Sequence, residues 1–330
     1  MHLPRLTAAL LAVAALALPV AATAAPHPSP AKSFVGTDGN TYPSAPQVVT
    51  GINGELYYGP DFDIACGLGS RTRRTMHQIG ELARVIERSG RTVVWAVAPN
   101  KSAVRPENLP DPLPHGDCDA RGLDDTGRVV ARVRDRNFLP LRDRLAGYRR
   151  ETYFHTDTHW TTVGGSLFAR AVAKRLDPRV AALQTYEYGT EQRLGILTYF
   201  QGGTQLETAE TAMPTTDVRS TTAPSSADQA WGGYPQVTYD YAWDTRPAKR
   251  TIPGRTVILG DSFTMFALDN LMPLFRHGRF LWRGNLDESV EFRAVKRADT
   301  VVIEVAEVLA PLGSPVADPG YRRRLEQFLR

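Results

Sequence analysis

Short continuous apolar runs constrain the fold of this chain more than any other feature of its sequence. They occupy residues 92–98, 256–259 and 300–306, and none of them alternates regularly between polar and apolar positions. A strand with one buried face alternates, whereas a strand buried on both faces is apolar throughout. The runs therefore predict central strands of a sheet that is covered on both faces.

Helical patterns around these runs supply the cover. Over residues 71–89, Met76, Ile79, Leu82 and other apolar residues recur at helical spacing, and Gly90 is placed to end the helix. Strands that alternate with helices predict an α/β fold, a three-layer sandwich around a mostly parallel sheet. The same patterns predict further helices over 129–147, with a possible break at Pro140, and over 161–176, 263–275 and 288–297. They also predict short strands over 153–155 and 279–282.

The N-terminus has the features of an export signal. Arg5 precedes an apolar run over residues 6–20, and Ala22-Thr23-Ala24 supplies the small residues that signal peptidase prefers. The run of about 15 residues is shorter than the ~20 that cross a bilayer as a helix. We expect residues 1–24 to be a cleaved signal, with retention as an anchor as the alternative, and the mature protein to be exported.

One catalytic domain is expected over residues 46–330. The segment before it, 25–45, is rich in Pro, Ser, Thr and Gly and predicts a flexible lead-in. Residues 201–250 predict an irregular surface insertion because Thr, Ser, Gly and Gln dominate there. Its aromatic residues suit either anchoring of the loop or stacking on sugar rings: Trp231, Tyr234, Tyr239, Tyr241 and Trp243.

The chain has two cysteines, Cys66 and Cys118. Export exposes them to an oxidising compartment, so we expect a disulfide that closes a loop of about 52 residues, with two free thiols as the alternative. The formal net charge is +4, and the Arg residues are scattered among Asp and Glu. We therefore expect no nucleic-acid partner.

Ser262 is the sharpest chemical signal. It follows the predicted strand 256–259 and begins the next helix, and Gly260 permits a tight turn. Ligands of α/β proteins bind beyond the carboxyl ends of the strands, and backbone N–H groups at a helix start can stabilise an oxyanion. These features suggest a nucleophile, although Ser is also a common helix N-cap.

A base for this nucleophile is suggested by the segment His155-Thr156-Asp157-Thr158-His159-Trp160. In extended backbone Asp157 and His159 leave from one face, so the carboxylate can orient the imidazole of a general base. Trp160 would wall the site. The alternatives are polar loop residues, with Asp157 or Thr158 as a helix N-cap, and a metal site formed by His155, Asp157 and His159. No further cluster of His or Cys in the sequence completes such a site, so we expect no metal and no cofactor.

Asn100 and Lys101 directly follow the predicted strand 92–98. Asn100 could donate to an oxyanion, and Lys101 could meet an anionic sugar; both residue types also suit an ordinary loop. Asp261, beside the nucleophile, is a further candidate for contact with the oxyanion or the substrate.

Four segments together resemble the alginate O-acetyltransferase family, which carries an AlgX/AlgJ-type SGNH hydrolase-like domain. They are GINGELYY from Gly51, VAPNK from Val97, TDTHW from Thr156 and GDSF from Gly260. The likeness covers about residues 46–310. It implies a flavodoxin-like SGNH fold in which the Asp-His element is permuted ahead of the Ser.

The resemblance implies that Ser262 is the nucleophile, His159 the base and Asp157 its orienting carboxylate. It also implies acetylation of an exported polysaccharide, either an exopolysaccharide or a cell-wall glycan, with a membrane-bound acyl-transfer protein as the source of acetyl groups. Glu55 departs from the family pattern, because many relatives carry Trp there. A carbohydrate acetylesterase of SGNH type and a non-catalytic carbohydrate-binding protein are the alternative functions.

Overall fold

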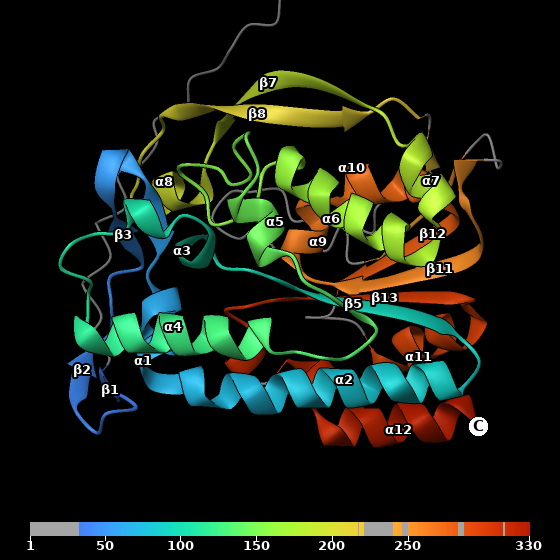
Figure 1. Ribbon diagram of the computed structural model, residues 1–330, viewed down its shortest axis with the longest axis horizontal. Helices are drawn as coiled ribbons and strands as arrows, with labels where there is room; N and C mark the ends of the chain where they lie inside the picture. The colour runs from blue at the N-terminus through green and yellow to red at the C-terminus, as the bar shows by residue number, and fades with distance from the viewer. Residues whose placement is uncertain (1–32, 217, 221–239, 246–249, 283–286, 313) are drawn as a thin grey trace, which may run out of the picture. The chain divides into compact units, whose positions relative to one another are not determined.

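The computed structural model describes residues 33–216, 218–220, 240–245, 250–282, 287–312 and 314–330 (Figure 1). The expected signal over residues 1–24 lies outside these residues. The described part from Ser33 to Arg330 clusters as one unit. Within it, no helix combines the length and the apolar character that crossing a membrane requires.

A mostly parallel sheet forms the centre of this unit. Its described strands follow the order β6-β5-β13-β11-β12-β10-β9. The first five strands in this order pair in parallel, whereas β10 and β9 extend the sheet as antiparallel strands. The bounds are β5 (Thr92–Ala98), β6 (Phe138–Leu139), β9 (Val218–Ser220), β10 (Asp240–Thr245), β11 (Ile252–Gly260), β12 (Phe275–Trp282) and β13 (Thr300–Ala306).

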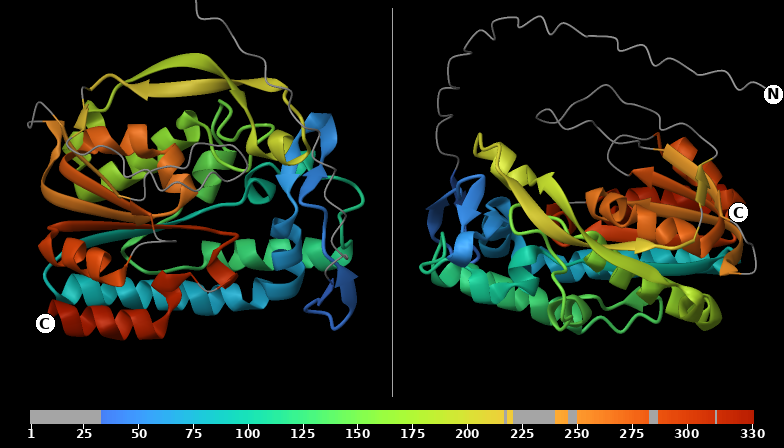
Figure 2. Two further views of the ribbon diagram at one scale, coloured as in Figure 1. Left: turned by 180° about the vertical axis from the view of Figure 1, so that it is seen from behind. Right: turned by 90° about the horizontal axis from the view of Figure 1, so that it is seen from above.

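Helices cover both faces of the sheet. In Figures 1 and 2, α2, α4, α11 and α12 lie on one face, and α5, α6, α9 and α10 lie on the other. Their bounds are α2 (Thr72–Arg88), α4 (Asp117–Ala131), α5 (Arg142–Ala146), α6 (Thr162–Leu176), α9 (Ser262–Phe266), α10 (Leu268–Leu271), α11 (Glu288–Arg297) and α12 (Pro319–Leu329). The shorter helices are α1 (Pro60–Leu68), α3 (Lys101–Val104), α7 (Pro178–Leu183) and α8 (Ile196–Phe200).

Alternate residues of β5 enter two separate apolar cores. Val94 and Ala96 pack in the core that contains Phe168 of α6, and Val93 and Val97 pack in the core that contains residues of α2. Six consecutive residues of β5 are buried because each face of the strand meets a layer of helices. The prediction of a sheet covered on both faces is confirmed.

Three hairpins lie outside the central sheet. They are β1 (Ser33–Val35) with β2 (Thr41–Pro43), β3 (Val48–Thr50) with β4 (Leu56–Tyr58), and β7 (Tyr186–Leu194) with β8 (Leu206–Pro214). The β7–β8 hairpin lies over the layer of α6 and α10 (Figure 2). Thr162 Oγ1 accepts from Ala212 N at 2.9 Å, and Asn270 Nδ2 donates to Ala212 O at 2.7 Å. These bonds join the hairpin to both helices.

The helix predicted over residues 129–147, with a possible break at Pro140, is interrupted before that proline. The helix α4 ends at Ala131, and Phe138–Leu139 becomes β6 at the edge of the sheet. Both side chains of β6 are buried, and the rings of Phe138 and Trp95 lie 4.6 Å apart. Burial against the sheet outweighs the local helical pattern.

The segment 263–275 also differs from the predicted helix. It divides into α9, α10 and a 3₁₀ turn over Met272–Leu274, and β12 already begins at Phe275. Proline at position 273 has no backbone N–H to donate, and it lies within the 3₁₀ turn. Likewise, only Tyr153 of the predicted strand 153–155 pairs, as a single bridge to Trp160.

The segments expected to be irregular contain strands. The lead-in includes the β1–β2 hairpin, and the insertion over 201–250 includes β8, β9 and β10. Trp243 of β10 is buried, and its indole N–H donates to Met272 O at 2.8 Å, so this aromatic residue is an anchor. Trp231, Tyr234 and Tyr239 lie outside the described residues, and so does the side chain of Tyr241.

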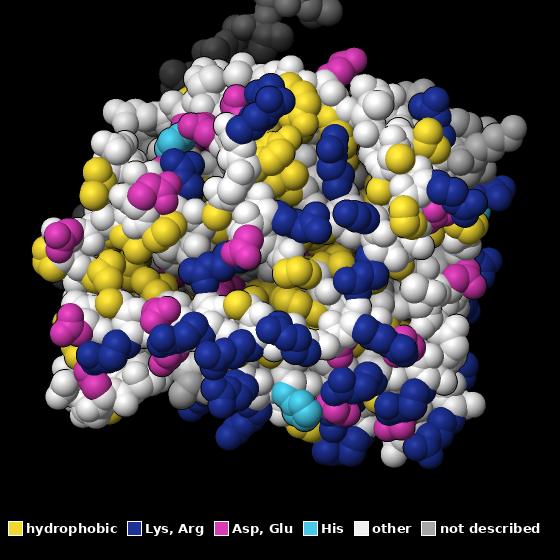
Figure 3. Space-filling view, viewed as in Figure 1, with side chains coloured by type: hydrophobic (Ala, Val, Ile, Leu, Met, Phe, Trp, Pro, Cys, Tyr) yellow, Lys and Arg dark blue, Asp and Glu magenta, His cyan; other side chains and the backbone are white. Residues whose placement is uncertain are grey.

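The surface of the α2, α4 and α12 layer is rich in charge. Figure 3 shows Lys and Arg side chains across this face with Asp and Glu side chains among them. Arg84 pairs with Asp135 at 3.1 Å, and Arg324 pairs with Glu288 at 2.6 Å. Acidic partners thus interrupt the positive charge on this face.

Candidate active site

Ser262 lies at the carboxyl edge of the sheet. It is the first residue of α9, directly after β11 and Asp261, and its side chain is half-buried. A Cβ atom at Gly260 would lie 2.1 Å from Thr264 Oγ1, so the turn needs glycine there. Within the described residues, the Ser262 hydroxyl makes no hydrogen bond. The hydroxyl is therefore available to a substrate or a base.

Two buried carboxyl groups brace this turn. Asp261 Oδ1 accepts from Phe263 N at 3.0 Å, and Asp261 Oδ2 accepts from Ala306 N at 2.7 Å. Glu304 Oε2 accepts from Thr264 Oγ1 at 2.8 Å and from Thr264 N at 3.2 Å. Burial and the neighbouring Asp261 raise the pKa of Glu304 well above its usual value. Asp261, a candidate for contact with substrate, is instead tied to α9 and β13.

Asp157 and His159 form a buried pair. His159 Nδ1 lies 2.7 Å from Asp157 Oδ1, and the His159 backbone N–H donates to the same oxygen at 3.1 Å. Asp157 is fully buried, and His159 is 6% exposed. Burial favours the neutral form of Asp157, yet His159, Arg193 and the backbone N–H of Ile196 hold the pKa of its carboxyl well below the usual range. An ionised Asp157 fixes Nδ1 as the protonated nitrogen and leaves Nε2 to accept a proton.

This pair packs against the helix that begins at Ser262. The His159 ring stacks on Phe266 with centroids 4.2 Å apart, and its centroid lies 4.9 Å from that of Phe263. The Trp160 indole N–H donates to Phe263 O at 2.8 Å. The structure thus brings Asp157 and His159 to α9, about 100 residues later in the chain.

Lys101 holds the loop of Asp157 and His159 from its buried side. Its Nζ donates to Phe154 O at 2.9 Å, His155 O at 2.9 Å and Asp157 O at 2.8 Å, and it pairs with Glu55 at 3.3 Å. The Lys101 side chain is 1% exposed. The expectation that Lys101 meets an anionic sugar is corrected here, because its ammonium group is buried and its three N–H donors are used.

The β7–β8 hairpin holds the same loop from the outside. Glu207 of β8 accepts from His155 N at 2.8 Å and from Thr156 Oγ1 at 2.5 Å. Arg193 of β7 lies 3.6 Å from Asp157 Oδ2 and over the ring of Phe266. Asp157 Oδ2 also accepts from Ile196 N at 3.1 Å. Both oxygens of the Asp157 carboxylate are therefore engaged.

Glu55 extends this network to His155. His155 Nδ1 lies 2.9 Å from Glu55 Oε2, and His155 Nε2 lies 2.9 Å from Glu151 Oε1. The hydrogen bond to Glu55 and the bond to Glu151 outweigh partial burial and raise the pKa of His155 to about 9. His155 is thus an ion-pair partner, with both ring nitrogens engaged by carboxylates.

Two other predicted residues lie away from the reacting groups. Trp160 is fully buried between Phe168 and Phe263, so it supports the site from within and does not wall it. Asn100 follows β5, and its backbone N–H donates to Glu307 Oε2 at 2.8 Å. Its side chain lines a cavity of ≈ 20 Å³ that Ser262 does not line.

A larger cavity adjoins Ser262. Its volume is ≈ 250 Å³, and Asp261 and Glu304 also line it. The rest of the lining comes from the end of β12, from β13 and from the turns that follow β13. The edge of the sheet therefore offers a space beside Ser262 that a small-molecule group can occupy.

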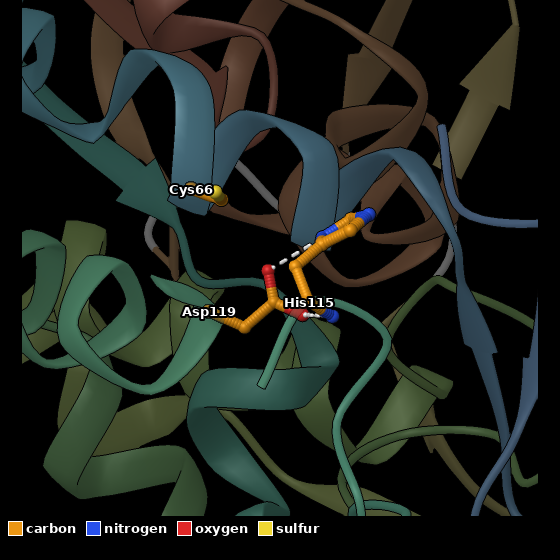
Figure 4. Close-up of side chains that lie close together, drawn as sticks. All are labelled: Cys66, His115 and Asp119. Carbon is orange, nitrogen blue, oxygen red and sulfur yellow. Dashed lines mark hydrogen bonds and ion pairs between the residues drawn. The ribbon is translucent and has the colours of Figure 1, made fainter. Parts of the chain in front are cut away.

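Cys66 and Cys118 are joined in a disulfide, as predicted. Cys66 also lies beside His115 and Asp119 (Figure 4), where ligating atoms of the three residues approach within 4.8 Å of one another. His115 Nδ1 lies 2.8 Å from Asp119 Oδ1, and His115 Nε2 lies 3.0 Å from Pro43 O. Because Cys66 is bonded to Cys118, it offers no thiolate, and the histidine ties α4 to the β1–β2 hairpin.

Sequence reasoning missed several residues that hold the loop over 155–159, which contains Asp157 and His159. Arg193 and Glu207 are single charged residues in segments without a motif. Glu55 is part of the GINGELYY segment but lies 100 positions before its partner His155. The one available signal was the departure of Glu55 from the family pattern. A glutamate in place of an apolar aromatic residue beside a buried strand indicates a buried cation nearby.

Comparisons with known proteins identify the family and the fold. The family described as "SGNH hydrolase-like domain, acetyltransferase AlgX" matches residues 48–235, which include Asp157 and His159 and end before Ser262. No sequence among the curated proteins matches the chain.

Three solved structures share the fold. A DHHW family protein from Eubacterium siraeum is 13% identical with a TM-score of 0.55, and the match covers 83% of this chain and 98% of that chain. The O-acetyltransferase domain of Pseudomonas putida AlgJ is 20% identical with a TM-score of 0.50, covering 85% and 98%. Bacillus cereus PatB1 is 16% identical with a TM-score of 0.56, covering 80% and 96%.

The fold likeness and the family match point the same way. The matched residues make up more than half of the chain, and the aligned structures share the mostly parallel sheet on which the site is built. The chain belongs to the AlgX family of SGNH hydrolase-like acetyltransferase domains.

Proposed function

We propose that this protein is an exported polysaccharide O-acetyltransferase that works through a Ser262–His159–Asp157 triad and an acetyl-serine intermediate. The observation that carries the proposal is the packing of the buried Asp157–His159 pair against α9, whose first residue is Ser262. Export is inferred from residues 1–24. The acceptor is an exopolysaccharide or a cell-wall glycan, and the acetyl source is a membrane-bound acyl-transfer protein.

In the first half-reaction, His159 Nε2 takes the proton of the Ser262 hydroxyl, because its Nδ1 faces Asp157. Ser262 Oγ then attacks the acetyl carbonyl of the donor. The bond from that carbonyl to the donor's leaving group breaks, and the leaving group takes the proton from His159. Backbone N–H groups at the start of α9 stabilise the oxyanion. The product is an ester between acetyl and Ser262.

In the second half-reaction, a sugar hydroxyl attacks the acetyl-serine ester. His159 accepts the hydroxyl proton and returns a proton to Ser262 Oγ as the ester bond breaks. Asp157 remains ionised and stabilises the imidazolium in both halves, in keeping with its depressed pKa. Water in place of the sugar would make the same groups an acetylesterase.

Mass spectrometry of oligosaccharides tests the proposal. The full chain is incubated with p-nitrophenyl acetate as donor and with either a neutral oligoglucoside or an acidic oligouronate as acceptor. We expect acetyl additions to sugar that disappear in Ser262→Ala. Ser289→Ala is the matched control, because Ser289 is also half-buried and lies on α11, outside the lining of this cavity.

The thermal midpoint of each variant separates chemistry from folding. Ser262→Ala should keep the midpoint of the wild type while it loses acetyl transfer. Donor hydrolysis without acetylated sugar would favour the esterase. Activity that survives in Ser262→Ala would contradict the proposed nucleophile, and an unfolded Ser262→Ala would show that the serine is structural.

A further inference from the structure

The cavity beside Ser262 has room for far more than an acetyl group. Its volume of ≈ 250 Å³ exceeds the roughly 150 Å³ of an apolar protein cavity that binds benzene, a molecule of six carbons. An acetyl group has two carbons. Accommodation of the acetyl group alone does not account for a space of this size.

The walls of the cavity are mostly apolar. Asp261 and Glu304 line the end of the cavity next to Ser262, where Glu304 accepts hydrogen bonds from Asp261 N and Thr264 Oγ1, so this end is polar. The apolar lining residues are Trp282, Val305, Leu309, Leu312 and Pro315. Apolar walls favour an alkyl chain over a sugar ring, whose hydroxyl groups would lose their hydrogen bonds to water there.

Two leucines at this cavity are unusually exposed. Leu309 is 40% exposed and Leu312 is 56% exposed. The turn that carries them is fixed: Leu309 N donates to Ala306 O at 3.0 Å, and Thr75 of α2 donates to Ala310 O at 3.0 Å. A fixed turn that presents leucine side chains to solvent at a reactive serine suits an apolar ligand that covers them.

The cavity and His159 lie on different faces of the sheet. Val305 belongs to the core on the α2 face, whereas His159 packs on Phe263 of the opposite core. An acyl chain in the cavity therefore leaves His159 free to exchange protons with Ser262. The same separation leaves the opposite face, where His159 lies, open for the acceptor.

We propose that this cavity receives the acyl chain of the donor and admits chains of about four to six carbons as well as acetyl. The inference rests on the proposed function and specifies the donor as an acyl ester or thioester. The acyl carbonyl carbon bonds to Ser262 Oγ as its bond to the donor oxygen or sulfur breaks. The leaving alcohol or thiol departs with the proton that His159 had taken.

Chain-length kinetics test this assignment. The kcat/KM of the full chain is measured for p-nitrophenyl acetate, butyrate and hexanoate, each corrected for spontaneous hydrolysis. Each buried methylene favours binding by about 3- to 4-fold, so we expect butyrate to exceed acetate about tenfold. In Leu309→Trp/Leu312→Trp the larger side chains narrow the cavity, and the hexanoate-to-acetate ratio should fall at least tenfold. Leu183→Trp is the control, because Leu183 is 42% exposed and lies on α7.

The outcomes separate this inference from the proposed function. Ser262-dependent turnover of acetate alone, or a ratio unchanged in the double variant, overturns the acyl cavity and leaves the acetyltransferase standing. If no ester is turned over, binding decides: N-methylhexanamide and N-methylacetamide are titrated into Ser262→Ala by NMR. The acyl cavity is supported if N-methylhexanamide binds and Leu309→Trp/Leu312→Trp abolishes that binding. It is overturned if the two amides bind equally or if neither binds.

Discussion

Replacement of Lys101 by methionine tests whether the catalytic loop depends on a buried cation. The substitution keeps most of the side-chain volume and removes the ammonium group. The carbonyls of Phe154, His155 and Asp157 then lose their common donor, and Glu55 loses its ion pair. At about 1 kcal/mol for each hydrogen bond, the three carbonyls account for about 3 kcal/mol.

Glu55 limits the further cost. It keeps His155 as a partner at 2.9 Å, so it is not left as an isolated buried charge. We therefore expect a total loss of about 3 to 4 kcal/mol, at the lower end of the 3–5 kcal/mol typical of breaking a buried pair. For a domain of this size that corresponds to a fall of about 5 to 6 °C in the melting temperature. A shift of about 1 Å in the Asp157–His159 loop would also lower turnover about 100-fold.

Urea denaturation and ester hydrolysis measure these effects. Lys174→Met is the control, because Lys174 is an exposed lysine of α6 and should tolerate the change. In a Glu55→Gln background the Lys101–Glu55 ion pair is already absent, so Lys101→Met should cost about 1 kcal/mol less there. Lys101→Met within 1 kcal/mol of the wild type, or strict additivity of the two substitutions, would refute the reasoning.

Three further predictions concern the dyad, its neighbouring histidine and the disulfide. Asp157→Asn should lower Ser262-dependent kcat by about 10⁴-fold, because the amide no longer fixes the His159 tautomer, and should also lower the melting temperature, because the folded state stabilises the ionised carboxylate; full activity in steady-state assays would exclude Asp157 from the triad. The pKa of His155 is raised from 6.5 to about 9, so its stabilisation is fully present below about pH 6.5 and is lost as the pH rises through 9. The rise in pKa corresponds to at most about 3.4 kcal/mol of stability, and solvent screening reduces this to about 1 to 2 kcal/mol because the side chain is 36% exposed. Urea titrations at pH 6 and pH 10 should show this loss of stability in the wild type and not in His155→Gln. Equal losses in the two proteins would contradict the prediction. Cys66→Ser/Cys118→Ser should lose about 4 kcal/mol in urea denaturation, the loop-closure value for a separation of 52 residues; an unchanged midpoint would mean that the reduced chain keeps the loop closed in the unfolded state.

The parts of the fold that were predicted well are those with strong local patterns. The strands β5 and β13 occupy the predicted residues, because a strand buried on both faces leaves an uninterrupted apolar run. The helix α11 also has its predicted bounds, since Asp287 caps its start and apolar residues recur on one side. In these elements, burial and sequence pattern carry the same information.

The β7–β8 hairpin was not predicted for the opposite reason. Most of β7 is exposed or half-buried, so Tyr186–Leu194 shows neither alternation nor an apolar run. Its strand structure comes from backbone pairing with β8 and from contacts to α6, which no local pattern encodes. Arg193 and Glu207 reach the site only through this hairpin, so their roles were missed with it.

The chemical residues show the same division. The Asp157–His159 pair was predicted because the two residues lie only two positions apart, although the loop is a bend closed by one bridge and not extended backbone. The position of Lys101 depends on tertiary contacts with a loop more than 50 positions away. A lysine suggested a negatively charged partner, but Lys101 donates three hydrogen bonds to backbone carbonyls and pairs with one carboxylate, that of Glu55.

The hold on the catalytic loop has a consequence for how this protein can evolve. Lys101 grips main-chain carbonyls, and Glu207 accepts from the main-chain N–H groups of His155 and Thr156. Main-chain atoms are the same in every residue, so the loop keeps its shape when neighbouring side chains are replaced. Thr158, half-buried beside His159, takes no part in this hold and is thus open to variation. Saturation mutagenesis of this one position can vary the surroundings of His159 while the backbone of the loop stays in place.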